Sequence, residues 1–224
     1  MRQHWQVVTF AHWRYDPAAV DRLLPSGVRT EPFESSAWVG IVAFRMADAR
    51  PPGIPWLSTF PELNLRTYVL GPDSRPGLWF FSLDAARLAV VAAGRAGFGL
   101  PYCWSRMQVD VAGDRVAYRS RRRWPDPRGA ACRLVVDVGA PLPDPGELAR
   151  WLTERYRVYT RIAGRWGTVA ASHPPWELAT ASLVELEDSV LTGAGLPPPA
   201  EPPLLHHSAG THAHLGRWRR LPAG

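Results

Sequence analysis

The fold of this chain is decided by residues 60–102, FPELNLRTYVLGPDSRPGLWFFSLDAARLAVVAAGRAGFGLPY. At its start, polar residues stand at every second position, namely Glu62, Asn64, Arg66 and Tyr68, between mostly apolar neighbours. Because successive side chains of a strand point to opposite faces, this spacing predicts a strand with all four polar side chains on one face. Such a row is either a solvated sheet face or the polar lining of a cavity.

The remainder of this stretch predicts a turn at 71–77, a strand at 78–81, a helix and a corner. Asp84 is a favoured residue for capping a helix, and the apolar residues Leu88, Val91 and Ala92 then repeat at helical spacing. We therefore predict a helix from Asp84 to about Arg95. The Gly-rich and Pro-containing segment 97–101 ends it, and residues 102–111 return as a strand.

Outside this stretch the pattern is rich in strands. We expect strands at 6–13, 28–33, 38–46, 116–124, 131–138, 164–171 and 178–187, with a final strand or tail at 204–218. Helices are expected at 17–24 and 147–159, each after an Asp-Pro pair that supplies a cap and a proline at the first helical position. A loop at 47–56 contains three prolines, and a Pro-rich linker spans 196–203. The absence of regular βαβ alternation favours an α+β fold with a mostly antiparallel, curled sheet.

The composition limits the number of domains and the types of catalysis that are possible. The chain has 224 residues, which we interpret as a single domain over 1–224, although two small domains would also fit this length. All 26 basic residues are Arg, so no side-chain amine exists for a Schiff base, and covalent catalysis by lysine is excluded. The eleven Trp residues indicate large apolar packing surfaces or an aromatic-lined pocket.

Several partner classes are not indicated. No secretory leader and no apolar run long enough for a membrane span are seen, so we expect a cytoplasmic protein without a membrane partner. Arg119 and the run Arg121, Arg122 and Arg123 fit a solvated strand edge better than nucleic-acid binding, because no recognised motif accompanies them. Cys103 and Cys132 lack the spacing of a zinc site. Of the C-terminal cluster His206, His207, His212 and His214, the last two share one strand face as a metal pair would, but no acid cluster or third well-spaced ligand accompanies them. We predict no metal and no cofactor.

Several motifs carry a resemblance to a known family. They are FPELNLRTYV, GLWFFSLDAARLAV, FGLPYCWSRM, ELARWLTERY, HPPW and PPLLHHS, and they span residues 5–218. Together they resemble the YqjF-like family of uncharacterised bacterial proteins, whose members are similar in fold to acetoacetate decarboxylase. The resemblance implies a closed or nearly closed β-barrel, a few flanking helices and a central ligand cavity. Within HPPW, His173 is expected to position the chain.

The same resemblance implies the site. Gly99-Leu100-Pro101 is similar to the corner that precedes the Schiff-base lysine of the decarboxylases, but Tyr102 and Cys103 follow it here. Glu62, after Phe60-Pro61, resembles their cavity glutamate, and we predict it as the catalytic residue. The predicted ligand-binding residues are Asn64, Arg66, Tyr68, Tyr102 and Arg106. Arginine clamps carboxylates, and a glutamate transfers protons near neutrality when desolvation raises its pKa.

Three functions remain open at this stage. The first is binding of a small carboxylated or carbonyl-bearing organic molecule in the cavity. The second is non-covalent acid–base catalysis on such a ligand, with Glu62 as proton carrier and Arg66 as anchor. The third is a structural or interaction protein whose barrel is filled by its own side chains. Members of this superfamily often self-associate, so the resemblance also allows a homo-oligomer.

Overall fold

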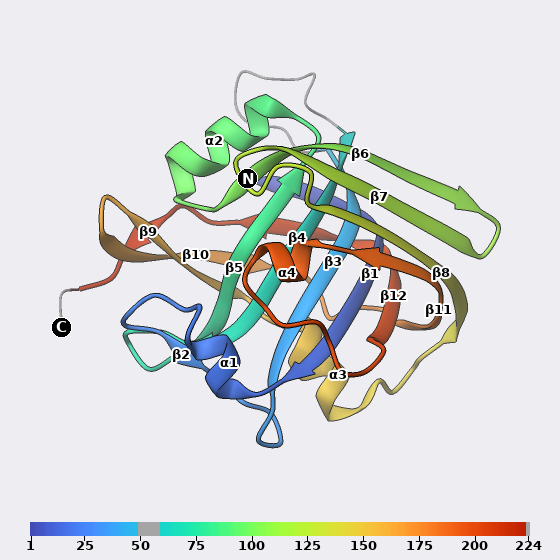
Figure 1. Ribbon diagram of the computed structural model, residues 1–224, viewed down its shortest axis with the longest axis horizontal. Helices are drawn as coiled ribbons and strands as arrows, with labels where there is room; N and C mark the ends of the chain where they lie inside the picture. Colours follow the sequence, from blue (N-terminus) through green and yellow to red (C-terminus); the bar gives the residue numbers. More distant parts are fainter. Residues whose placement is uncertain (49–58, 223–224) are drawn as a thin grey trace.

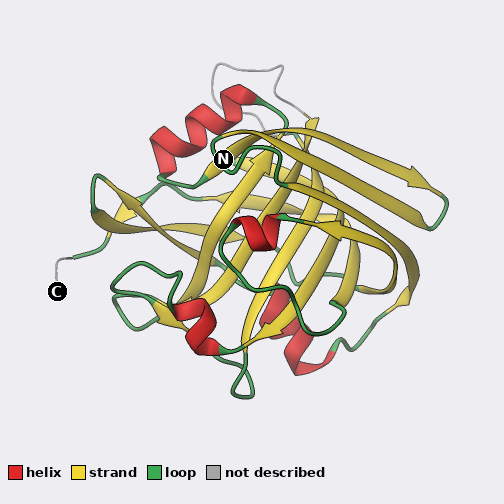
Figure 2. Cartoon of the chain, viewed as in Figure 1, coloured by secondary structure: helices red, strands yellow, loops and turns green. Residues whose placement is uncertain are grey.

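The computed structural model describes residues 1–48 and 59–222, and most of them lie in strands (Figures 1 and 2). The strands are β1 (Arg2–Tyr15), β2 (Arg29–Thr30), β3 (Ala37–Ala47), β4 (Thr59–Leu70), β5 (Pro76–Ala85), β6 (Tyr102–Ala112), β7 (Arg115–Trp124), β8 (Ala131–Pro141), β9 (Arg157–Ile162), β10 (Arg165–Ser172), β11 (Ala179–Asp188), β12 (Leu204–Leu215) and β13 (Arg219–Arg220). The helices are α1 (Pro17–Asp21), α2 (Leu88–Phe98), α3 (Gly146–Thr153) and α4 (Val190–Gly193). The mostly antiparallel α+β fold predicted from the sequence is confirmed.

All thirteen strands join one sheet that curls back on itself (Figure 1). The hydrogen-bonded order is β13-β10-β9-β5-β6-β7-β8-β11-β12-β1-β3-β4-β2, with additional pairings of β4 with β5 and of β10 with β12. These additional pairings make two nearly closed rings that share β12, β1, β3, β4 and β5. One ring is completed by β9 and β10, and the other by β6, β7, β8 and β11.

This arrangement buries both faces of the shared strands. On β4, Phe60 and Tyr68 pack in one apolar core together with residues of β9 and β10. Leu63 and Leu65 point the other way, into a second core with residues of β7 and β8. A strand between two cores has no solvated face, so the polar row of β4 faces the interior. Of the two interpretations of this row, a solvated sheet face is therefore excluded.

The corner after α2 ends the helix within the predicted segment 97–101. Gly99 ends the helix with φ of 63°, and its amide donates to the carbonyl oxygen of Arg95. A β-carbon at this position would also collide with the carbonyl oxygen of Arg161, so the site favours glycine for two reasons. Leu100 and Pro101 then lead directly into β6, which pairs with β5 in parallel.

The start of α2, however, was predicted wrongly. Asp84 lies inside β5 and is fully buried, and the helix begins only at Leu88, after Arg87. The Asp84 carboxylate accepts hydrogen bonds from Ser82, Ser105 and Arg122 instead of capping a helix. The arginine run was predicted to lie on a solvated strand edge. Arg119, Arg121 and Arg123 are exposed, as expected, but β7 is paired on both sides and is not an edge, and Arg122 is buried.

Other boundaries also differ from the prediction. Helix α1 starts as predicted, with Asp16 accepting from the Ala18 amide, but it ends at Asp21. Helix α3 ends at Thr153 rather than 159, because residues from Arg157 onward pair with β10 as strand β9. Helix α4 was not expected. The predicted loop at 47–56 lies outside the described residues, apart from Ala47, which ends β3, and Asp48. Within the described ranges, no helix is long and apolar enough to cross a membrane.

Candidate functional site

A cavity of about 220 Å³ lies inside the ring that β9 and β10 complete. Its walls come from the shared strands, from α2 and from the segment before β11, and they are mostly apolar. The polar residues that line it are Gln3, Glu62, Asn64, Arg66, Tyr102, Thr153, Arg155 and His173. A mostly apolar cavity with a few convergent polar groups is the usual form of a small-molecule site.

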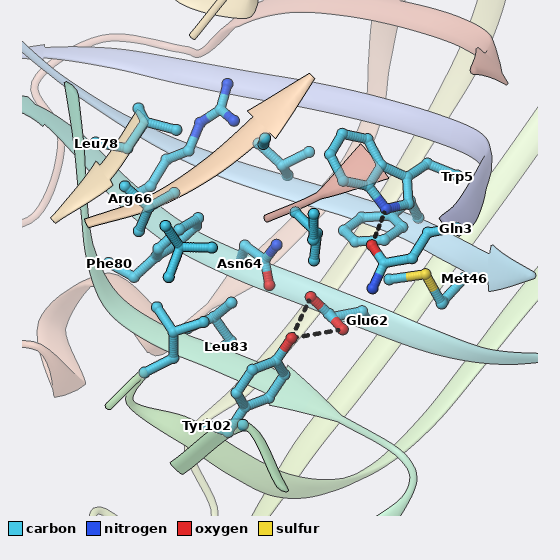
Figure 3. Close-up of a pocket in the computed structure, with 18 of the residues that line it drawn as sticks. Gln3, Trp5, Met46, Glu62, Asn64, Arg66, Leu78, Phe80, Leu83 and Tyr102 are labelled. Atoms are coloured by element: carbon cyan, nitrogen blue, oxygen red, sulfur yellow. Dashed lines mark hydrogen bonds between the residues drawn. The ribbon is translucent and has the colours of Figure 1, made fainter. Parts of the chain in front are cut away.

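Strand β4 presents three of these polar side chains (Figure 3). Glu62, Asn64 and Arg66 occupy successive inward positions and are 3%, 9% and 9% exposed. Their register is held from both sides, because Asn64 pairs with Val42 of β3 and with Leu83 of β5. A rigid, doubly paired strand fixes the spacing of the three groups along the cavity wall.

Glu62 and Tyr102 form the centre of the site. The Tyr102 hydroxyl points at the carboxylate and donates to Oε1 and Oε2, each at 3.4 Å (Figure 3). Burial raises the pKa of Glu62 to about 7, a rise that nearby Asp84 reinforces and that hydrogen bonds from Asn64 and Tyr102 oppose. Burial, together with the adjacent Glu62, also raises the pKa of Tyr102 well above its usual value, so its hydroxyl stays a donor. Near neutral pH the carboxyl group therefore populates both protonation states.

Helix α2 holds Tyr102 in place. Gly94 lies so close to the Tyr102 ring that a β-carbon there would collide with it. The Arg95 guanidinium donates to the Tyr102 carbonyl oxygen at 2.8 Å. The position of Tyr102 thus follows from packing of its ring against a helix and from a contact to its backbone.

Arg66 brings a positive charge to the cavity wall. Its Nη2 donates to the Leu152 carbonyl oxygen at 2.9 Å, and its guanidinium carbon lies 5.7 Å from the centre of the Phe10 ring. Its Nε has no hydrogen-bond partner, and within 1–48 and 59–222 it forms no ion pair. Arg155, by contrast, is neutralised by Glu31 at 3.0 Å. Among the described residues, Arg66 is therefore a buried cation without an ion-pair partner.

Two of the predicted ligand-binding residues do not line the cavity. Tyr68 is fully buried, and its hydroxyl donates to the Leu152 carbonyl oxygen and lies 2.8 Å from His12 Nε2. Arg106 is exposed on β6. The structure thus brings together Glu62, Asn64, Arg66 and Tyr102 out of the six predicted site residues.

Comparison with known proteins gives the family. Residues 2–212 match the model of DUF2071, described as an uncharacterized conserved protein. The chain belongs to the DUF2071 family. It is 36% identical over 212 residues to the uncharacterized protein YqjF of Bacillus subtilis (strain 168), a match that covers 93% of this chain and 87% of the relative.

Solved structures show the fold of this DUF2071 protein. An acetoacetate decarboxylase from Legionella pneumophila superposes with a TM-score of 0.70 at 15% identity, covering 99% of this chain and 87% of that one. The enduracididine biosynthesis enzyme MppR, solved with pyruvate, superposes with a TM-score of 0.67 at 16% identity, covering 99% and 90% of the two chains. The acetoacetate decarboxylase-like fold implied by the sequence motifs is confirmed.

Sequence reasoning missed an aromatic wall of the cavity in this DUF2071 protein. It consists of Trp5, Phe10, Phe44 and Trp176, which come from β1, β3 and the segment before β11. His173 lies beside both indoles, with its ring centre 5.6 Å from that of Trp5 and 4.9 Å from that of Trp176. No spacing in the sequence links these residues, and the high tryptophan content was the only available signal.

The cysteines and the C-terminal histidines lie apart from the cavity wall. Burial raises the pKa of the Cys103 thiol to about 11, so it is a poor nucleophile at neutral pH. On β12, His212 stacks on His4 with ring centres 4.1 Å apart, and His207 Nδ1 lies 3.0 Å from the Thr9 hydroxyl. In the part of the chain that the structure describes, no group of three His, Cys, Asp or Glu residues is placed to hold a metal ion.

Proposed function

We propose that this DUF2071 protein binds a small organic molecule bearing a carboxylate or carbonyl group. The site is the cavity inside the ring of strands that β9 and β10 complete. The observation that carries the proposal is Arg66, a buried guanidinium on the cavity wall with no ion-pair partner in the described residues. A buried charge without a partner is costly, and a ligand carboxylate would supply the missing counter-charge. Tyr102, which lines the same cavity, offers a hydroxyl donor to a carbonyl oxygen.

The fold supports the same class of ligand. MppR, which shares this fold, has been solved with pyruvate, a small keto acid. This chain cannot form a Schiff base through a lysine side chain, because it contains no lysine. The cavity itself argues against a barrel filled completely by its own side chains.

Arg66→Ala tests the anchor. Pyruvate, acetoacetate and lactate are expected to raise the melting temperature of the wild type, because a ligand that binds the folded state stabilises it by mass action. In Arg66→Ala we expect at least about tenfold weaker binding, because the carboxylate loses its buried cation. The readout is a thermal-shift titration, with neutral acetone in parallel.

Arg106→Ala is the matched control for that experiment, because Arg106 is an exposed arginine that does not line the cavity. Its melting temperature should respond to each acid as the wild type does. Equal stabilisation of Arg66→Ala and the wild type, or no stabilisation by any of the acids, would contradict the proposal.

A second function, acid–base catalysis on the same ligand, is favoured by the state of Glu62. A carboxyl group with a pKa of about 7 can both accept and donate a proton at physiological pH. The step would be removal of a proton from the carbon beside a carbonyl by the Glu62 carboxylate. The C–H electron pair then forms an enolate, whose oxygen is stabilised by the Tyr102 hydroxyl, and protonation of the carbon reverses the step.

Proton exchange measures this step directly. In heavy water, the wild type is expected to replace the protons beside the carbonyl of a bound keto acid with deuterium, followed by NMR. The rate should rise with pH as Glu62 ionises near pH 7, and Glu62→Gln should lower it at least about tenfold. Glu185→Gln is the control, because Glu185 is a half-buried glutamate on β11 that does not line the cavity. Unchanged exchange in Glu62→Gln would remove Glu62 from any such reaction.

A further inference from the structure

The polar groups of the cavity occupy only a small part of its wall. Glu62, Asn64 and Arg66 all project from β4, and Tyr102 lies opposite Glu62 (Figure 3). Most of the remaining wall is aliphatic or aromatic. A ligand that contacted only the polar row would leave this apolar wall without a partner. The wall therefore indicates that the ligand also has an apolar part.

The aromatic part of the wall is continuous. The rings of Trp5 and Trp176 are stacked with centres 6.0 Å apart, and Phe10 meets Trp176 edge-on at 5.1 Å. The centre of the Phe44 ring lies 6.0 Å from that of Trp5. Aromatic rings at these separations form a surface that favours a further ring through stacked or edge-on contacts.

The two indoles have no free donor for a polar ligand group. Trp5 Nε1 donates to Gln3 Oε1 at 2.8 Å, and Trp176 Nε1 donates to the Thr153 carbonyl oxygen at 3.1 Å. These bonds also fix the orientation of both rings. The wall therefore offers only ring faces and edges, which select an apolar group and reject a polar one.

The cavity has room for such a group. Its volume of about 220 Å³ exceeds the roughly 150 Å³ of an apolar protein cavity that accommodates benzene. Opposite β4, helix α2 lines it with the small residues Ala89, Ala93 and Gly94, which leave this space open. A three- or four-carbon acid would occupy only a part of it.

From these observations we infer that the ligand is an aromatic 2-oxo acid, an inference that rests on the proposed function. Its carboxylate pairs with Arg66, and its ring packs against Trp5 and Trp176. The indoles then set specificity by excluding water from an apolar group, while β4 recognises the charged end. Small keto acids such as pyruvate bind by the charged end alone.

Calorimetric titration with pyruvate and phenylpyruvate tests the inference, because the two acids differ only by the phenyl ring. Phenylpyruvate is expected to bind the wild type at least about tenfold more tightly. Trp5→Leu should remove most of that gain and leave the affinity for pyruvate within about twofold. Trp166→Leu is the matched control, since Trp166 is also half-buried but packs on Trp79 outside the cavity. It should bind both acids as the wild type does.

The outcomes separate the two proposals. Equal affinity of the wild type for pyruvate and phenylpyruvate would overturn the aromatic inference and leave the proposed function standing. Binding of neither acid would overturn both. A loss of phenylpyruvate affinity that is equal in Trp5→Leu and Trp166→Leu would also refute a role for the aromatic wall. Circular dichroism establishes that each variant is folded, and Phe44→Leu replaces Trp5→Leu should the latter not fold.

Discussion

Replacing Asp84 with alanine is expected to lower the free energy of unfolding by about 3–5 kcal/mol. The Asp84 carboxylate accepts from Arg122 Nε at 3.0 Å and from Nη2 at 2.8 Å, and from the Ser105 hydroxyl at 2.6 Å. The side chains of Asp84 and Arg122 are 1% and 6% exposed. Removal of the carboxylate leaves a buried guanidinium without a counter-charge, which is the main source of the loss. Urea denaturation measures it.

Asp137→Ala is the matched control. Asp137 also accepts two hydrogen bonds from one arginine, Arg115, both at 2.8 Å, but that pair is exposed. Exposed pairs contribute at most about 1 kcal/mol, so the two aspartates should differ clearly. Replacing the buried pair together, as Asp84→Leu with Arg122→Met, should recover part of the loss because no lone charge remains. A cost for Asp84→Ala no greater than for Asp137→Ala would mean that the buried pair does not hold β5 to β7.

The second large effect concerns Glu62 and pH. Its pKa is raised from the usual 4.5 to about 7, so between these values the folded protein binds more protons than the unfolded chain. The free energy of unfolding therefore falls as pH rises through this range, by about 3 kcal/mol for a shift of this size. Glu62→Gln removes the cost of ionisation and keeps the shape of the side chain. We expect it to unfold like the wild type near pH 4 and to be more stable by about 3 kcal/mol near pH 8.

Denaturation curves of both proteins across this range provide the measurement. Glu185→Gln should show the opposite sign, because the hydrogen bond from Arg133 lowers the pKa of Glu185 and so contributes stability above the usual pKa. A Glu62→Gln variant whose stability differs from the wild type by the same amount at every pH would contradict a raised pKa for Glu62. It would then also remove the main support for acid–base catalysis.

Much of the fold could be predicted from the sequence because its signals are local. The alternation over 62–68 assigned Glu62, Asn64 and Arg66 to one face, and the structure places all three on the cavity wall. The Gly99 corner follows from the left-handed backbone that glycine accepts without strain. The motifs of the chain led to the decarboxylase-like fold through a resemblance, not through periodicity.

The errors at the start of α2 and at the end of α3 have a common cause. In both places the local sequence pattern is compatible with a helix and with a strand. An Asp before a helical apolar pattern suits a cap, yet Asp84 ends a strand because Arg122, 38 residues away, lies beside it. The helical pattern at 147–159 continues past Thr153, but pairing between β9 and β10 takes residues 157–159 into the sheet. Long-range pairing overrode local propensity in both places.

By itself, the sequence determined what chemistry this protein lacks and which side chains share a face. It contains no lysine, so a side-chain Schiff base is excluded whatever the fold, and the period of two in β4 aligns its polar row. Only the tertiary structure decided that this row faces a cavity, that Tyr102 reaches Glu62 across 40 positions of sequence, and that Arg66 has no ion-pair partner within 1–48 and 59–222. The reason is physical: burial, and with it the pKa of Glu62, depends on how the sheet closes around the group, and that closure joins residues that no local pattern connects.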